Sequence, residues 1–109
     1  MSENYSYFAN LAGELAEIPA DTIVSRTVYN SDELKVILFG FAPGQELSEH
    51  TAARPAILHF LRGQAKVTVG GDAYTAQEGA FVRMDPKLPH SVYAESEVVM
   101  LLLMLAPPR

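Results

Sequence analysis

The side chains best suited to chemistry in this sequence are its three histidines, His50, His59 and His90. Neutral imidazoles are common ligands of divalent metals, and they exchange protons near neutral pH. A divalent metal held tightly in a protein needs at least three protein ligands, with water or substrate completing the set. Two of these histidines alone therefore predict either a weak metal site or a polar group that binds a small molecule.

Other chemistries lack the residues they need. The sequence contains no cysteine, which excludes disulfides, thiolate metal ligands and a cysteine nucleophile. It also shows no Ser-His-Asp order, no phosphate-binding glycine loop and no acid pair, and the spacing of Ser48 and His50 does not by itself make a nucleophile. Arg54 and Arg83 are candidates for binding a carboxylate with two hydrogen bonds, the alternative being solvated or ion-paired arginines on a rim.

Length, charge and hydropathy narrow the class of protein. At 109 residues the chain predicts one domain, and with 49% hydrophobic and 19% charged residues that domain should be globular. The net charge of −5 argues against nucleic acid and anionic membranes as partners. The longest apolar run, residues 98–106, is too short for a membrane-spanning helix, and no basic segment precedes an apolar run at the N-terminus. Together with the missing cysteines, this predicts a cytoplasmic protein.

From residue 22 onward the sequence has the pattern of short strands separated by turns. Residues 65–69 alternate between apolar and polar, and Gly70-Gly71 can supply positive φ angles at both central positions of a tight hairpin. Nine strands are predicted in this way, at residues 22–29, 34–41, 46–50, 56–61, 65–69, 73–76, 80–84, 90–94 and 98–105. Short strands at this spacing, with no long helical pattern between them, predict an all-β sandwich or closed barrel and exclude a parallel α/β sheet.

Residues 1–20 are predicted to form an N-terminal arm, and residues 21–109 the barrel itself. In the arm, Phe8, Leu11 and Leu15 have a spacing that suits a short helical turn, interrupted by Gly13 and Pro19.

Three of the predicted strands, residues 34–41, 56–61 and 98–105, are apolar on both faces. Strands of this kind are covered on both sides, whereas a small barrel buries only its inner face. We therefore expect a second copy of the chain to cover the outer face, which makes the protein a homodimer. The alternative is that the N-terminal arm covers one of these strands.

Around these strands, the glycines and histidines resemble the two sequence motifs of the cupins. Gly44, His50 and Gly63 are similar to the first motif, and Gly79 followed by a turn and His90 is similar to the second. The resemblance covers about half of the chain and is closest to the small single-domain cupins. It implies an all-β jelly-roll barrel of the double-stranded β-helix (cupin) type, which in many members holds a divalent metal such as zinc, manganese, iron or nickel.

The chain departs from the ligand set of the metal-binding cupins, which is three histidines and a glutamate or glutamine. By the resemblance, His50 and His90 take the first and last histidine positions and face each other in the lumen. Ala52 replaces the second histidine, and Ala56 replaces the acidic residue. The resemblance thus implies that only His50 and His90 remain as metal ligands.

Counting every second residue from Ala56 places two further side chains in the lumen and His59 on the opposite face. We expect His59 to lie at the subunit interface, and we expect Glu46, which has the parity of His50 on an extended strand, to reach the mouth of the pocket. The predicted ligand-binding residues are His50, Ala52, Ala56, Leu58, Phe60 and His90.

Two functions of different classes fit these residues. The first is a non-catalytic module that binds a small molecule in the lumen, with a weakly held divalent metal or with none. The second is a metal-dependent enzyme similar to the cupin oxygenases and isomerases. The first is favoured because Ala52 and Ala56 remove half of the usual ligand set.

Overall fold

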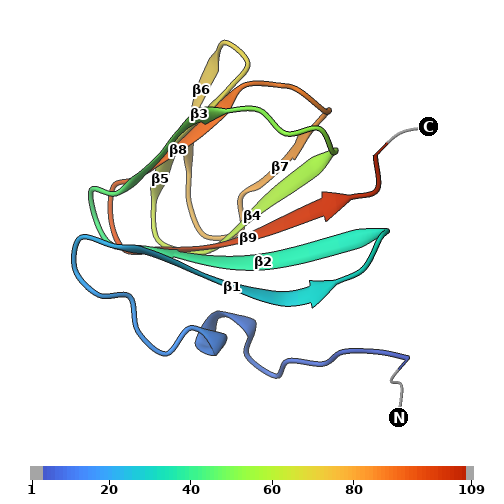
Figure 1. Ribbon diagram of the computed structural model, residues 1–109. Helices are drawn as coiled ribbons and strands as arrows, with labels where there is room; N and C mark the ends of the chain where they lie inside the picture. Colours follow the sequence, from blue (N-terminus) through green and yellow to red (C-terminus); the bar gives the residue numbers. More distant parts are fainter. Residues whose placement is uncertain (1–3, 108–109) are drawn as a thin grey trace.

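The computed structural model describes residues 4–107 as two antiparallel sheets that face each other (Figure 1). One sheet has five strands in the order β1-β2-β9-β4-β7, and the other has four in the order β3-β8-β5-β6. The strands are β1 (Ile23–Asn30), β2 (Leu34–Phe41), β3 (Glu46–His50), β4 (Ala56–Arg62), β5 (Ala65–Val69), β6 (Asp72–Ala76), β7 (Phe81–Met84), β8 (His90–Ala94) and β9 (Val98–Leu105).

The predicted all-β fold is confirmed, and the strand bounds agree closely with the sequence pattern. Five strands, β2, β3, β5, β8 and β9, have the predicted bounds. Every strand pair between residues 4 and 107 is antiparallel. In the same part of the chain, no helix has the length and apolarity needed to cross a membrane. The ends of the predicted arm and barrel, residues 1–3 and 108–109, lie outside the described residues.

The space between the two sheets is filled by the inward side chains of both. On β4, Ala56, Leu58 and Phe60 are 3%, 2% and 0% exposed, whereas Ile57 and His59, which alternate with them, are half-buried on the other face. This alternation follows from the pleat of a strand, which points successive side chains to opposite sides. The core so formed consists of Phe41, Ala56, Leu58, Phe60, Ala65, Val67, Ala76, Met84, Val92, Ala94, Val98 and Met100.

The outer face of the five-stranded sheet is covered in part by the N-terminal arm, which runs along it in Figure 1. The arm contains one short 3₁₀ helix, η1 (Leu11–Glu14), whose first turn is capped by the Asn10 side chain accepting from the Gly13 amide. Apolar side chains of the arm, including Leu15 and Ile18, pack against buried Leu38 and Val99. A second copy of the chain is therefore not needed over β2 and β9, because the arm covers their outer face, which was the alternative expectation.

Gly40 leaves the space on β2 into which side chains of the arm pack. A Cβ at this position would lie 2.7 Å from the Ile18 Cδ1 atom and 2.9 Å from the Leu15 Cδ1 atom, so a larger residue would displace the arm. On the neighbouring strand β1, Arg26 donates to the Glu14 backbone carbonyl at 3.1 Å and to its carboxylate at 2.8 Å. The arm is thus attached by apolar packing at its centre and by a charged pair at its side.

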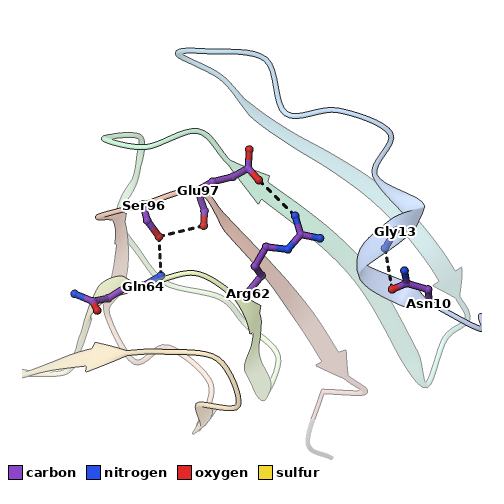
Figure 2. A network of polar contacts seen from close by, with 6 residues as sticks. All are labelled: Asn10, Gly13, Arg62, Gln64, Ser96 and Glu97. Carbon is purple, nitrogen blue, oxygen red and sulfur yellow. Dashed lines mark hydrogen bonds and ion pairs between the residues drawn. The ribbon is translucent and has the colours of Figure 1, made fainter.

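At one end of the barrel, the turn after β4 packs directly on the turn before β9. Gly63 has a φ of 88°, and a Cβ there would overlap the carbonyl oxygen of Glu97. Figure 2 shows the hydrogen bonds that join the two turns, including the Gln64 amide donating to Ser96 Oγ at 2.9 Å. The same figure shows Arg62 paired with Glu97 beside these turns. The glycine that ends β4 is therefore required by a close approach of backbone as well as by its φ angle.

Candidate functional site

A β-bulge on β3 directs His50 toward the interior of the barrel. Leu47 pairs with Val92 and His50 pairs with His90, so two residues of β3 stand opposite a single residue of β8. Leu47 packs against the core, and regular alternation from it would have turned His50 outward. The extra residue corrects this, as bulges commonly do beside functional sites.

The bulge also overturns the expected position of Glu46. The prediction assumed an extended segment in which Glu46 and His50 share one face. Because the strand is bulged, Leu47 and His50 share the inner face instead, and Glu46 is exposed, opposite Tyr93. Glu46 is therefore not a residue of the pocket mouth.

The rings of His50 and His90 lie against each other, with centroids 4.2 Å apart and planes inclined by 59°. His90 is 6% exposed, whereas His50 is open to solvent, so the pair extends from the core to the surface. Each Nδ1 atom lies close to the carbonyl oxygen two residues earlier in the chain, at 2.8 Å for His50 and Ser48 and at 2.9 Å for His90 and Leu88.

These two hydrogen bonds fix what the histidines offer to a ligand. A carbonyl oxygen only accepts, so in each ring it is the Nδ1–H group that donates. In the neutral imidazole the remaining nitrogen, Nε2, then carries the lone pair. Metal-binding histidines are oriented in the same way, by a hydrogen bond from the ring nitrogen that does not bind the metal. The pair thus presents two Nε2 atoms, each able to bind a metal or to accept a hydrogen bond.

The donor set around these atoms does not complete a metal site of the usual kind. Within residues 4–107, no three side chains among His, Cys, Asp and Glu cluster closely enough to hold an ion together. Two imidazoles give fewer protein ligands than a tightly bound divalent metal requires. The residues present therefore do not fit a tightly held catalytic metal.

The other predicted site residues occupy two different surroundings. Ala56, Leu58 and Phe60 are on the inner face as the parity count predicts, but they are packed in the core between the sheets. Ala52 lies after the end of β3, in a half-buried loop whose backbone is tied to the opposite turn, because its carbonyl accepts from the Lys87 amide at 2.7 Å. The structure therefore brings the two histidines together and leaves Ala52 outside the strand that carries His50.

His59 lies on the outer face of β4, away from the histidine pair. Its Nδ1–H group donates to the Ala80 carbonyl at 3.1 Å, and its ring meets Phe81 edge-on at a centroid distance of 6.3 Å. The ring is thus held by the neighbouring strand β7, and it takes no part in the pair.

The two candidate arginines also differ. Arg54 donates from Nε to the Leu105 carbonyl at 2.6 Å, so its guanidinium ties the loop before β4 to the end of β9. Arg83 pairs with Asp85 at 2.8 Å, and both side chains are largely exposed. Arg54 therefore has a structural role, and Arg83 stays available to a ligand.

A cavity of about 660 Å³ lies beside the histidine pair, between β5, β6, β7 and the turn before β8. Two of its lining residues adjoin His90, since Val69 is its cross-strand partner on β5 and Leu88 accepts its hydrogen bond. Sequence reasoning had not selected these residues. The signal was present in the alternation of residues 65–69, which turns Val67 and Val69 inward.

Two facing antiparallel sheets and a histidine on each of two adjacent strands define a small β-barrel of cupin type with a reduced set of metal ligands. The chain belongs to the cupins, because the family described as "Cupin domain" matches residues 37–106, which is more than half of the sequence. The matched region includes both histidines of the pair. No curated protein matches the chain.

Solved structures with the same fold support this assignment. A conserved protein of unknown function from Streptococcus pyogenes is 28% identical, with a TM-score of 0.84 over 98% of this chain and 93% of its own. A cupin 2 conserved barrel domain protein from Leptotrichia buccalis is also 28% identical, with a TM-score of 0.79 over 85% of this chain and 45% of its own. A cupin superfamily protein from Desulfitobacterium hafniense, 22% identical over 88% of this chain and 87% of its own, has a TM-score of 0.83 and shows the fold alone.

Proposed function

We propose that this cupin is a binding protein that holds a small molecule beside His50 and His90. The observation that carries the proposal is the pair of Nδ1–H hydrogen bonds to backbone carbonyls, which leaves both Nε2 atoms for a ligand. The cavity next to His90 supplies apolar surface for the rest of the molecule. An apolar cavity with a few convergent polar atoms is the usual character of a small-molecule site.

A metal-dependent enzyme of the oxygenase or isomerase type is the second candidate. It is favoured by the same two Nε2 atoms, since zinc, manganese, iron or nickel would bind there with water or substrate as the remaining ligands. It ranks second because alanines stand at positions 52 and 56, where metal-binding cupins have ligands. In the binding protein a divalent metal is held weakly or not at all.

The experiment that separates the two candidates measures metal content and zinc affinity together. Elemental analysis of the purified protein is expected to show far less than one metal per chain, and a Zn²⁺ titration by calorimetry is expected to show weak binding. Replacing one ligand of a two-ligand site should weaken that binding, so His50→Ala and His90→Ala should each lower the affinity by about tenfold or more. His59→Ala, the matched control on the outer face, should leave the affinity unchanged. A stoichiometric metal that survives purification would favour the enzyme instead.

We also propose that a second copy covers the part of the outer face that the arm leaves open, with the protein a cytoplasmic homodimer that binds neither nucleic acid nor membrane. The support is an apolar surface on β4 and β9 formed by Ile57, Leu103 and Leu105, none of them fully buried. Leu103→Glu would place a charge in that interface, at a position that faces outward. Light scattering at micromolar concentration is expected to give a dimer for the wild type and a monomer for the variant. A monomeric wild type would contradict the homodimer.

A further inference from the structure

The cavity beside the histidine pair has an apolar floor. Val67 and Val69 reach it from β5, Val82 from β7, and Leu88 from the turn that precedes β8. Its volume of about 660 Å³ lies within the range of small-molecule sites, which is roughly 300–1,000 Å³. The floor therefore suits the apolar body of a small ligand.

The cavity lies between β6 and β7, the two strands that end the four-stranded and five-stranded sheets on this side. Tyr74 stands on β6 opposite Val67, so it has the parity of the inward residues, and yet 57% of it is exposed. A large aromatic residue on an inner face is normally buried. Here its ring borders the cavity, where it offers an aromatic wall to a ligand.

The charged groups at the cavity decide what polar group the ligand carries. Arg83 pairs with Ile57 and therefore lies on the outer side of the edge strand β7, from which it also lines the cavity. Within residues 4–107, Nη1 is the one nitrogen of its guanidinium with a hydrogen-bond partner, the exposed carboxylate of Asp85. Exposed ion pairs of this kind contribute little to stability, so a ligand carboxylate can share the guanidinium or replace Asp85. Asp72, on β6, puts a negative charge at the same cavity and disfavours a second negative charge on the ligand.

We infer that this cavity binds a monocarboxylate with an apolar body, such as a small aromatic acid. The body packs on Val67 and Val82, the ring of Tyr74 forms one wall, and the carboxylate pairs with Arg83. The part of the ligand farthest from Arg83 extends past Val69 and Leu88 toward His90. The inference rests on the proposed function in that it names the class of molecule held beside the histidines, and it adds a site residue, Arg83, that lies outside the pair.

The test uses 4-fluorobenzoate as the probe and 4-fluorobenzyl alcohol, which has the same ring without the charge, as its neutral counterpart. Binding of each is followed by ¹⁹F NMR on the full chain. The acid is expected to bind more tightly than the alcohol. Because a guanidinium–carboxylate pair is a charge-assisted interaction, Arg83→Gln should weaken the acid by about tenfold and leave the alcohol unchanged. Arg62→Gln, which removes another exposed, ion-paired arginine, is the matched control and should change neither.

Two further variants locate the probe. Ala80→Leu adds side-chain volume to the wall of the cavity and should weaken both probes, with folding checked by thermal melting. Equal binding of acid and alcohol, indifference to Arg83→Gln or to Ala80→Leu, or no binding at millimolar concentration would each overturn the inference. His50→Ala combined with His90→Ala separates it from the proposed function. If that double variant binds the acid like the wild type while Arg83→Gln does not, the result supports the carboxylate site at Arg83 and contradicts the proposed role of the histidines in binding.

Discussion

The two faces of the five-stranded sheet are both apolar, but they are covered by very different means. The inner face meets a second sheet along its length, and residues such as Leu58 and Phe60 are 2% and 0% exposed. Within residues 4–107, the outer face is covered where the arm lies on β2 and β9, whereas on β4 apolar residues such as Ile57 stay half-buried. Apolar residues on both sides of a strand therefore predict that both faces are covered, but they do not predict how completely each face is buried.

Histidines that face into and out of the barrel differ in the same way, although His90 lies on the four-stranded sheet and His59 on the five-stranded sheet. His90 projects inward, and its ring lies against that of His50, so the imidazoles of two residues are brought together. His59 projects outward, where its only ring neighbour is Phe81 among the aromatic contacts of residues 4–107. Both histidines have Nδ1 hydrogen-bonded to a carbonyl, so the local geometry is alike. It is the face of the sheet that separates a candidate ligand-binding histidine from a structural one.

Matched leucine truncations on β4 should show the largest difference between the faces. Leu58→Ala opens a cavity in a closed core and is expected to lower the free energy of unfolding by about 3 kcal/mol. Leu61→Ala removes a half-buried side chain from the outer face and is expected to cost about 1 kcal/mol. Urea unfolding followed by circular dichroism gives both values. Equal losses would mean that the outer face is as tightly packed as the inner one.

Filling the space at Gly40 in which the arm packs should have the next largest effect on the free energy of unfolding. In Gly40→Val the new side chain occupies the space of Leu15 and Ile18, so the arm detaches and exposes the residues beneath it. The expected loss is about 2 kcal/mol of unfolding free energy, with faster proteolysis of residues 4–22. Gly71→Val is the control, because a Cβ at Gly71 meets no atom within 4 Å. If the arm of the Gly40 variant resists protease as the wild type does, the cover described for β2 and β9 is wrong.

Most of the fold could be predicted because its signals are local. Alternation along residues 65–69, the Gly70-Gly71 turn and the glycine–histidine motif spacing are short-range signals, and together they predicted the strands and the barrel. Of the two glycines in the turn, Gly70 has the expected positive φ and Gly71 does not. The orientation of residues 56–60 followed from a period of two along an unbroken strand. The Gly63 position was recognised as part of a motif, although the close approach to Glu97 that requires it comes from a residue far along the chain.

The parts that the sequence did not predict depend on contacts between distant segments. The bulge on β3 adds one residue without any glycine or proline to mark it, so the parity count misplaced Glu46. The arm packs on its sheet in the space left at Gly40, and that surface forms only when β1, β2 and β9 are assembled. The cavity beside His90 is formed by three strands and a turn, so no single stretch of sequence describes it.

The central claim is that His50 and His90 act as one site through their Nε2 atoms while His59 does not. Long-range ¹H–¹⁵N spectra of the imidazole rings, recorded during a Zn²⁺ titration, test it directly. The prediction is that all three rings start with the proton on Nδ1, and that the Nε2 signals of His50 and His90 then shift together along one saturation curve while His59 stays in place. Separate curves for His50 and His90, or a shift of His59 along with them, would contradict the account.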